Sequence, residues 1–157
     1  MTLPVPRLVA MAFSQVLGQP CQAIEGQSID FNPRNRTVLT PILNALGGAQ
    51  GLAICDQDLA VFLVAAARDQ HRETLQEALI APFFLGEDLY KLQEILAPLA
   101  NLMASDGAEF SVGLGWVDPH AARSPDVEAV LQAPAQRLDL QVTVQGYGLG
   151  RLSLLTI

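Results

Sequence analysis

The chain has 157 residues, half of them apolar and 16% charged, which fits a single domain that buries roughly 70% of its unfolded surface. A formal net charge of -7 and nine scattered basic residues exclude a general binder of nucleic acid or anionic membranes, because both need clustered lysine and arginine. No stretch approaches the roughly 20 apolar residues of a membrane span, and no signal-peptide cleavage pattern follows the N-terminal apolar run. We therefore expect a cytoplasmic protein without membrane insertion.

The first predicted element is a helix over Leu8–Leu17, where apolar residues recur at helical spacing. Gly18 and Pro20 end it, since glycine suits a helix C-terminus and proline cannot continue a helix. The segment Cys21–Asn32 is rich in turn residues, and its spaced apolar residues indicate a short strand.

The segment Val38–Leu46 is ambiguous. Thr40-Pro41 resembles an N-cap followed by the first helical residue, but the six residues before Gly47-Gly48 are short for a helix. We interpret the segment as a strand with Pro41 at an edge or a bulge. It runs through a Gly-Gly turn into a second strand, Gly51–Cys55.

The rest of the chain interleaves helices with strands. Asp56 and Asp58 stand at the start of an Ala-rich helix, as the helix dipole favours. The glycine string Gly146, Gly148 and Gly150 precedes a strand rather than a helix, so it indicates a hairpin turn and not a phosphate-binding loop. The predicted elements are helices over Gln57–Arg68, Glu73–Ile80 and Leu89–Ser105, strands over Phe110–Val117, Leu138–Gln145 and Gly150–Ile157, a loop over Asp118–Asp126 and a further element over Val127–Gln132. The order predicts an α+β fold in one domain, residues 1–157, with helices packed on one face of an antiparallel-rich sheet.

The helix predicted over Leu89–Ser105 has two different faces. Its apolar stripe consists of Leu89, Leu92, Leu96, Leu99 and Met103, and its polar stripe of Lys91, Glu94, Pro98, Asn101 and Ser105. A proline inside a helix removes a hydrogen bond and kinks the helix at a cost of about 3 kcal/mol. We therefore expect a break or bend between Glu94 and Pro98. On pattern alone, the polar stripe is a solvated face.

The other reactive side chains form no recognisable constellation. His71 and His120 stand apart from other metal ligands, and no serine is flanked by the glycines of a nucleophile elbow. Cys21 and Cys55 lie in different predicted elements, and we expect both to be reduced thiols. The sequence therefore predicts no metal and no cofactor.

Once the helix over Leu89–Ser105 is included, the order of predicted elements in this chain resembles that of the CheC/CheX/FliY family of chemotaxis phosphatases. The resemblance covers most of the chain. It comprises an N-terminal helix, a strand, the Gly-Gly turn in Leu46-Gly-Gly-Ala-Gln-Gly-Leu-Ala-Ile, a helix, a signature helix, the loop Val117-Asp-Pro and long strands at the end. The resemblance implies a CheC/CheX-like fold.

The resemblance also implies where a site would lie. In that family the signature helix carries a glutamate and, three residues later, an asparagine. The asparagine is taken to orient a water for attack on the aspartyl phosphate of a CheY-like receiver, and the glutamate to engage the receiver's lysine. Asn101 matches the asparagine, whereas Pro98 stands at the glutamate position. Glu94 matches an outer position, about 10.5 Å from Asn101 along the helix axis. Asn101 and Glu94 are therefore the candidate catalytic residues.

The missing carboxylate predicts a degenerate family member, since catalysis by positioned groups needs the whole geometry. We expect a module that binds a CheY-like receiver or another signalling protein, with phosphatase activity weak or lost. We also expect a homodimer, because the last two strands offer exposed edges. The alternative is a small, acidic, dimeric protein like a secretion chaperone, which binds an unfolded client. Such a chaperone has a dimer-forming helix between its strands and needs no exposed asparagine stripe.

Overall fold

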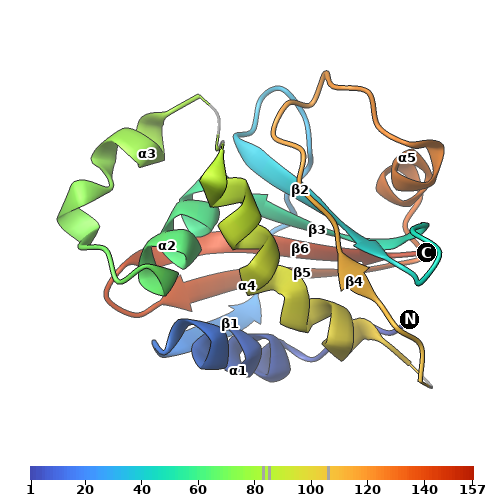
Figure 1. The fold of residues 1–157 in the computed structure, drawn as a ribbon, viewed down its shortest axis with the longest axis horizontal. Coiled ribbons are helices and arrows are strands. Elements are labelled where there is room, and N and C mark those ends of the chain that lie inside the picture. Colours follow the sequence, from blue (N-terminus) through green and yellow to red (C-terminus); the bar gives the residue numbers. More distant parts are fainter. Residues whose placement is uncertain (83, 85, 106) are drawn as a thin grey trace.

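A computed structural model gives the fold and describes residues 1–82, 84, 86–105 and 107–157. In this part of the chain, six strands form one antiparallel sheet in the order β1-β5-β6-β3-β2-β4. The elements are α1 (Pro6–Leu17), β1 (Cys21–Glu25), β2 (Thr37–Leu43), β3 (Ala49–Asp56), α2 (Gln57–Ala67), η1 (Arg72–Thr74), α3 (Gln76–Ile80), α4 (Glu87–Met103), β4 (Ser111–Val112), α5 (Pro125–Gln132), β5 (Gln136–Val144) and β6 (Gly148–Thr156). Figure 1 shows α4 crossing in front of the sheet, with α1 below it and α2 to its left.

Alternation along the strands gives the sheet two apolar faces. Ala53 of β3 and Leu154 of β6 belong to the core beneath α1, α2 and α4. Leu52 and Leu155 belong to a second core on the opposite face, where Val127 of α5 packs with them. The predicted α+β fold, an antiparallel sheet with helices on a face, is confirmed. Helix α5 adds a cover on the other face.

The helix ends follow local sequence signals. α1 ends at Leu17 as predicted, and Gly18 after it has a left-handed φ of 65°. The carboxylate of Asp56 caps α2 by accepting the Leu59 N–H at 2.9 Å. The single helix predicted over Glu73–Ile80 is instead two short pieces, η1 and α3. None of the helices that the structure describes is both long enough and apolar enough to span a bilayer.

The last two strands form the predicted hairpin. β5 and β6 pair along their whole length on either side of the turn at Gln145-Gly146-Tyr147. Both lie inside the sheet, because β1 pairs with β5 and β3 pairs with β6. The prediction that these strands offer exposed edges is therefore wrong. The edge strands are β1 and β4, since earlier segments of the chain return to flank the hairpin.

The strand predicted over Phe110–Val117 is only partly formed. The segment contributes the two residues of β4 and a separate bridge from Trp116 to Leu39 of β2. Between them, the Pro41 carbonyl accepts the Gly113 N–H at 2.9 Å, but proline has no N–H to return. The missing donor interrupts the ladder. β2 is not an edge strand, and Pro41 therefore does not lie at the sheet edge. It faces the short edge strand β4, and the register shift in the pairing of β2 with β3 follows it, between Ile42 and Leu43.

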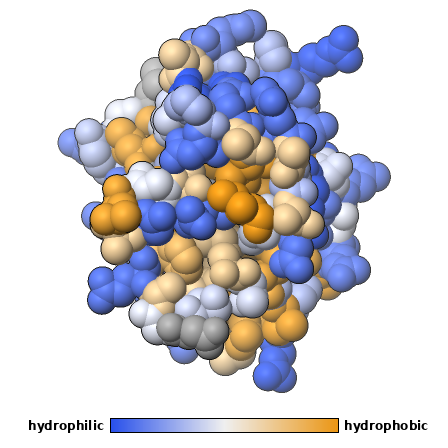
Figure 2. Space-filling model, turned by 90° about the vertical axis from the view of Figure 1, so that its right-hand side faces the viewer, coloured by the Kyte–Doolittle hydropathy of each residue, from blue (hydrophilic) through white to orange (hydrophobic). Residues whose placement is uncertain are grey.

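Both chain termini lie at one end of the sheet (Figure 1). The Thr2 N–H donates to the carbonyl of Met103, the last residue of α4, and the Ile157 N–H donates to Gln50 in β3. Figure 2 views this end and shows apolar side chains gathered at its centre between hydrophilic ones. The last turn of α4 therefore lies at the same end as the termini.

Candidate functional site

Helix α4 is fixed in position by contacts with three other elements. It packs against α1, α2 and β4. Arg68 at the end of α2 forms an ion pair with Asp88 in the first turn of α4. The Gln93 side chain donates to the Val112 carbonyl of β4 at 2.9 Å. The buried residues of α4 are Leu92, Ile95, Leu96, Leu99, Ala100 and Met103, which include most of the predicted apolar stripe.

Pro98 lies inside α4 without ending it. The helix runs uninterrupted from Glu87 to Met103, so of the expected break or bend the break is absent, and a bend stays a prediction. Because Pro98 has no N–H, the Glu94 carbonyl one turn earlier lacks the hydrogen bond that an N–H at position 98 would donate in a regular helix. The packing of Leu99 and Met103 in the core keeps the last turn in helical geometry despite this loss.

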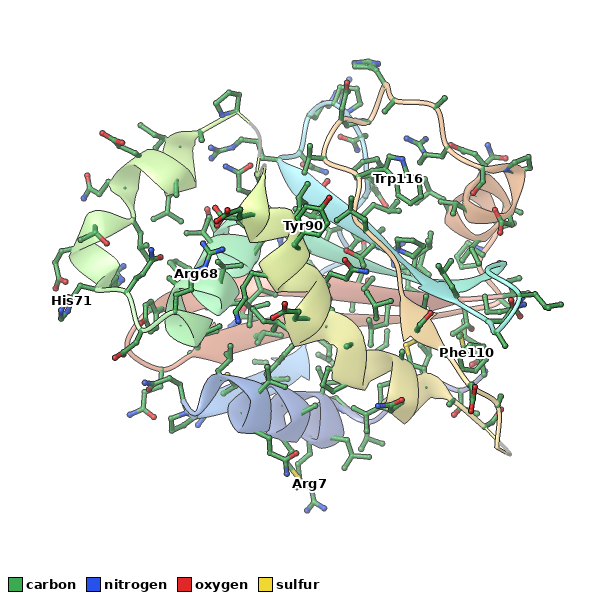
Figure 3. All side chains as sticks on the ribbon, viewed as in Figure 1. Arg7, Arg68, His71, Tyr90, Phe110 and Trp116 are labelled. Atoms are coloured by element: carbon green, nitrogen blue, oxygen red, sulfur yellow. The ribbon has the colours of Figure 1, made fainter. Side chains whose placement is uncertain are left out.

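The exposed face of α4 carries Tyr90, Glu94, Ala97 and Asn101, which we call the α4 stripe. Their spacing of four, three and four residues places them on one side of the helix. Figure 3 shows Tyr90 in the first half of α4, on the face turned away from the sheet. Tyr90 is 61% exposed. The predicted polar stripe is therefore confirmed as solvent-facing at Glu94 and Asn101.

Glu94 is engaged locally rather than with Asn101. The Lys91 ammonium donates to the Glu94 carboxylate at 3.2 Å, an exposed pair one turn apart. Glu94 lies two turns before Asn101 on the same face, which is about 10.5 Å along the axis. The structure thus does not bring the two predicted site residues together around one water molecule.

Asn101 instead borders a polar hollow of about 460 Å³, which we call the Asn101 hollow. Asn44 at the end of β2 and Glu109 before β4 line it together with Asn101. The Asn44 carboxamide oxygen is occupied, since it accepts the N–H groups of Leu46 and Gly48 at 3.0 and 2.9 Å. Sequence reasoning missed Glu109 and Asn44, because both flank strands and show no spacing relation to α4.

The other reactive residues lie elsewhere. Cys21 and Cys55 are free thiols, as predicted, and burial raises the pKa of both. For Cys55 the neighbouring carboxylate of Asp56 adds to this effect. Among the residues that the structure describes, no three His, Cys, Asp or Glu side chains gather closely enough to hold a metal ion.

No protein-family model matches this sequence, and no curated protein matches it either. Solved structures are similar in fold. FliY of Thermotoga maritima is 11% identical with a TM-score of 0.60, over 94% of this chain and 82% of that chain. The FliM middle domain from H. pylori is 10% identical with a TM-score of 0.51, over 96% and 84%. FliM in a FliM-SpeE complex from H. pylori is 9% identical with a TM-score of 0.51, over 96% and 80%.

At sequence identities of 9 to 11%, similarity to a solved structure shows only that the fold is similar. The similarity in fold to FliY and to the FliM middle domain extends over 94% and 96% of this chain. The expected resemblance is confirmed at that level, and the chain has the CheC/CheX/FliY-type fold.

Proposed function

We propose that the protein is an interaction module that docks on a CheY-like receiver domain, or on another signalling protein, through the α4 stripe. Its aspartyl-phosphate phosphatase activity is weak or lost. The observation that carries this proposal is an exposed helical face that keeps Asn101 and has Pro98 where the partner carboxylate would stand. The similarity of the fold to FliY supports it.

The chemistry of the α4 stripe favours binding over hydrolysis. The Asn101 carboxamide has both a donor and an acceptor for a water molecule, but no carboxylate lies one turn before it. Glu94 is two turns away and pairs with Lys91. A single amide can orient a water molecule, but no second side chain then fixes the position of the partner. We therefore expect only a small acceleration of hydrolysis.

The same surface has features of an interface. Tyr90 offers a large, exposed aromatic side chain, a residue type enriched at protein interfaces and among their hot spots. The helix beneath it is fixed by the core, so docking on this face needs little rearrangement of the backbone. A receiver could therefore approach α4 along its exposed length.

Binding is tested with purified receiver domains from the same genome, phosphorylated with acetyl phosphate. Biolayer interferometry should show one or more receivers binding the intact protein. Tyr90→Ala and Asn101→Arg should each weaken binding about tenfold, the effect of losing one hot-spot contact. Leu149→Ala, a change at an exposed apolar residue of β6, serves as the matched control. Failure of every receiver to bind would remove the proposal.

Hydrolysis is measured separately, by following the decay of the phosphorylated receiver with and without the protein. We expect little or no acceleration. If the protein clearly accelerates dephosphorylation and Asn101→Ala abolishes this acceleration, the proposal that activity is weak or lost is wrong. The proposal that the receiver docks on the α4 stripe would still stand.

The alternative, a dimeric chaperone for an unfolded client, has less support. The similarity of the fold to FliY and the exposed Asn101 favour the signalling module. A homodimer remains a proposal of its own, and sedimentation velocity tests it. Suppression of aggregation of a chemically denatured client, together with a dimer, would favour the chaperone.

A further inference from the structure

A groove separates α1 from the edge strand β1, and its position is distinct from the α4 stripe. It has a volume of about 670 Å³, and its walls are mostly apolar. Ala10 and Met11 form part of the helical wall, and Ala23 and Ile24 part of the strand wall. We call it the α1–β1 groove. None of the residues of the α4 stripe lines it.

The strand wall presents unused backbone groups to this groove. The Pro20 carbonyl accepts the Gln145 N–H at 3.0 Å, and the Gly26 N–H donates to Asp139 in β5 at 3.0 Å. In an antiparallel pair, alternate residues face the partner strand, so the residues at 20, 22, 24 and 26 face β5. The backbone groups of Cys21, Ala23 and Glu25 therefore point outward, toward the free edge.

Among the described residues, one of these outward groups has a hydrogen-bond partner. The Cys21 N–H donates to the Ser14 hydroxyl of α1 at 2.9 Å. Within the described residues, no hydrogen bond satisfies the outward N–H or C=O of Ala23 and Glu25. Such a row of alternating donors and acceptors is complementary to the backbone of one more strand.

From this arrangement we infer that the α1–β1 groove binds an extended peptide segment of a partner protein, added to the sheet as a strand beside β1. The open backbone groups of Ala23 and Glu25 supply the hydrogen bonds. Met11 and Ile24 supply the apolar contacts for alternate side chains of the segment. This inference goes beyond the proposed docking through α4 and does not depend on it.

Charge indicates which segments fit. The protein carries a formal charge of -7, yet among the residues that the structure describes the only charged side chain lining the groove is that of Arg7. Figure 3 shows Arg7 projecting from α1 into solvent. No described residue forms an ion pair with Arg7. The segment therefore carries an acidic group near one end, paired with Arg7, and apolar residues at alternate positions.

A second copy of the chain fits less well than a slender segment. The bond from Cys21 to Ser14 places the second half of α1 beside the first residue of β1 and leaves the edge at Ala23 and Glu25 open. If β1 of another copy paired there, its own α1 would occupy the same side and meet this α1. A single extended segment brings no helix with it, so it enters the groove without that clash.

The experiment selects binders from a phage-displayed library of random seven-residue peptides on the full-length protein. Two variants report the mechanism. Ala23→Pro removes the outward N–H while leaving the bonds to β5 intact, and Met11→Asp places a charge in the apolar wall. Val16→Asp is the matched control, because Val16 lies on the same helix with similar exposure, 40% against 47% for Met11, and does not line the groove. Thermal melts verify that each variant is folded.

We expect enriched peptides with alternating apolar residues and an acid. Their affinity should fall about tenfold or more on Ala23→Pro and on Met11→Asp, and stay unchanged on Val16→Asp. Bound peptide should also slow alkylation of the half-buried Cys21 thiol, which lines the groove. The inference is overturned if no peptide is enriched, if enriched peptides bind Ala23→Pro as well as the native protein, or if the protein is a dimer that Ala23→Pro converts to a monomer. None of these results bears on receiver binding at α4.

Discussion

Glu94 and Asn101 share the exposed face of α4 two turns apart, and Pro98 lies between them, one turn before Asn101. The helix tolerates the proline because residues on both sides of it are fixed in the core. A single residue can remove a carboxylate from a surface without disturbing the apolar face beneath it.

Replacing Pro98 with glutamate should stabilise the protein. Glu supplies the N–H that the Glu94 carbonyl lacks and has a far better helix propensity than proline. We expect the free energy of unfolding to rise by about 1 to 3 kcal/mol, measured by urea denaturation. Ala97→Glu adds the same charge at a neighbouring exposed position and should change stability by less than about 0.5 kcal/mol. A less stable Pro98→Glu protein would show that the proline ring packs favourably.

The same substitution should restore phosphatase activity toward any receiver that binds the protein. Pro98→Glu puts a carboxylate one turn before Asn101. We expect receiver dephosphorylation to accelerate by about 100-fold over the native protein, the lower end of the range typical of a positioned group. Adding Asn101→Ala to Pro98→Glu should cancel the gain. Acceleration that survives the Asn101→Ala change would mean that the amide is not the group that orients the water.

Asp56 should contribute to stability through two different elements. One carboxylate oxygen caps α2 at Leu59, and the other accepts the Arg151 N–H of β6 at 3.0 Å. Asp56→Ala leaves both donors without a partner, so we expect a loss of about 1 to 3 kcal/mol in urea denaturation. Asp58→Ala, a change at an exposed acid in the first turn of α2, should cost less than about 1 kcal/mol. Equal losses for the two variants would contradict the bridging role of Asp56.

Gly150 allows α2 to approach β6 closely. A Cβ at this position would lie 2.5 Å from the Leu59 Cβ and 2.6 Å from an Asp56 carboxylate oxygen. Gly150→Ala should therefore destabilise the protein by about 1 to 3 kcal/mol, since packed elements cannot give way without strain. Leu149→Ala, at the exposed neighbour, should change the melting temperature little. If the Gly150→Ala protein is as stable as the native protein, α2 can move away from β6 without a loss in the free energy of unfolding.

The carboxylate of Asp126 should make stability depend on pH. It accepts the Ala49 N–H at 2.6 Å, and this bond holds the pKa of Asp126 below its ordinary value of about 3.9. A lowered pKa in the folded state stabilises the protein above the ordinary value, and the effect is lost as pH falls through the folded value. Asp126→Asn should cost on the order of 1 kcal/mol at neutral pH.

That cost should shrink as the pH falls below about 4, because the carboxyl of the unfolded chain takes up a proton first and the native carboxyl follows at its lower pKa. Urea denaturation at a series of pH values measures it. Glu77→Gln, at an exposed acid of α3, is the control and should show no comparable trend. A cost for Asp126→Asn that stays constant from neutral to acid pH would contradict the role given to the charge.

Local signals explain why much of the fold followed from the sequence. Gly18 ends α1 because a left-handed residue closes a helix there, and the glycine-flanked turn at Tyr147 joins β5 to β6. The buried side of α4 follows from residues three and four apart. Each of these features depends on neighbours within a few positions in the chain.

Features set by distant segments did not follow from the sequence. The interior position of β5 and β6 depends on β1 and β3 pairing with them. The short β4 depends on Pro41, some 70 residues earlier, which lacks the N–H that a longer ladder needs. The place of Glu109 beside Asn101 likewise depends on how the segment before β4 meets α4.

The sequence by itself determined the two-faced α4, the proline one turn before Asn101 and the α+β class, because periodicity and residue chemistry act over one or two helical turns. Only the tertiary structure decided that Asn101 borders the Asn101 hollow rather than acting with Glu94, and that β1 is an edge strand beside α1. Strand order and the meeting of remote segments are set by the free energy of the whole packed core, which no local pattern contains.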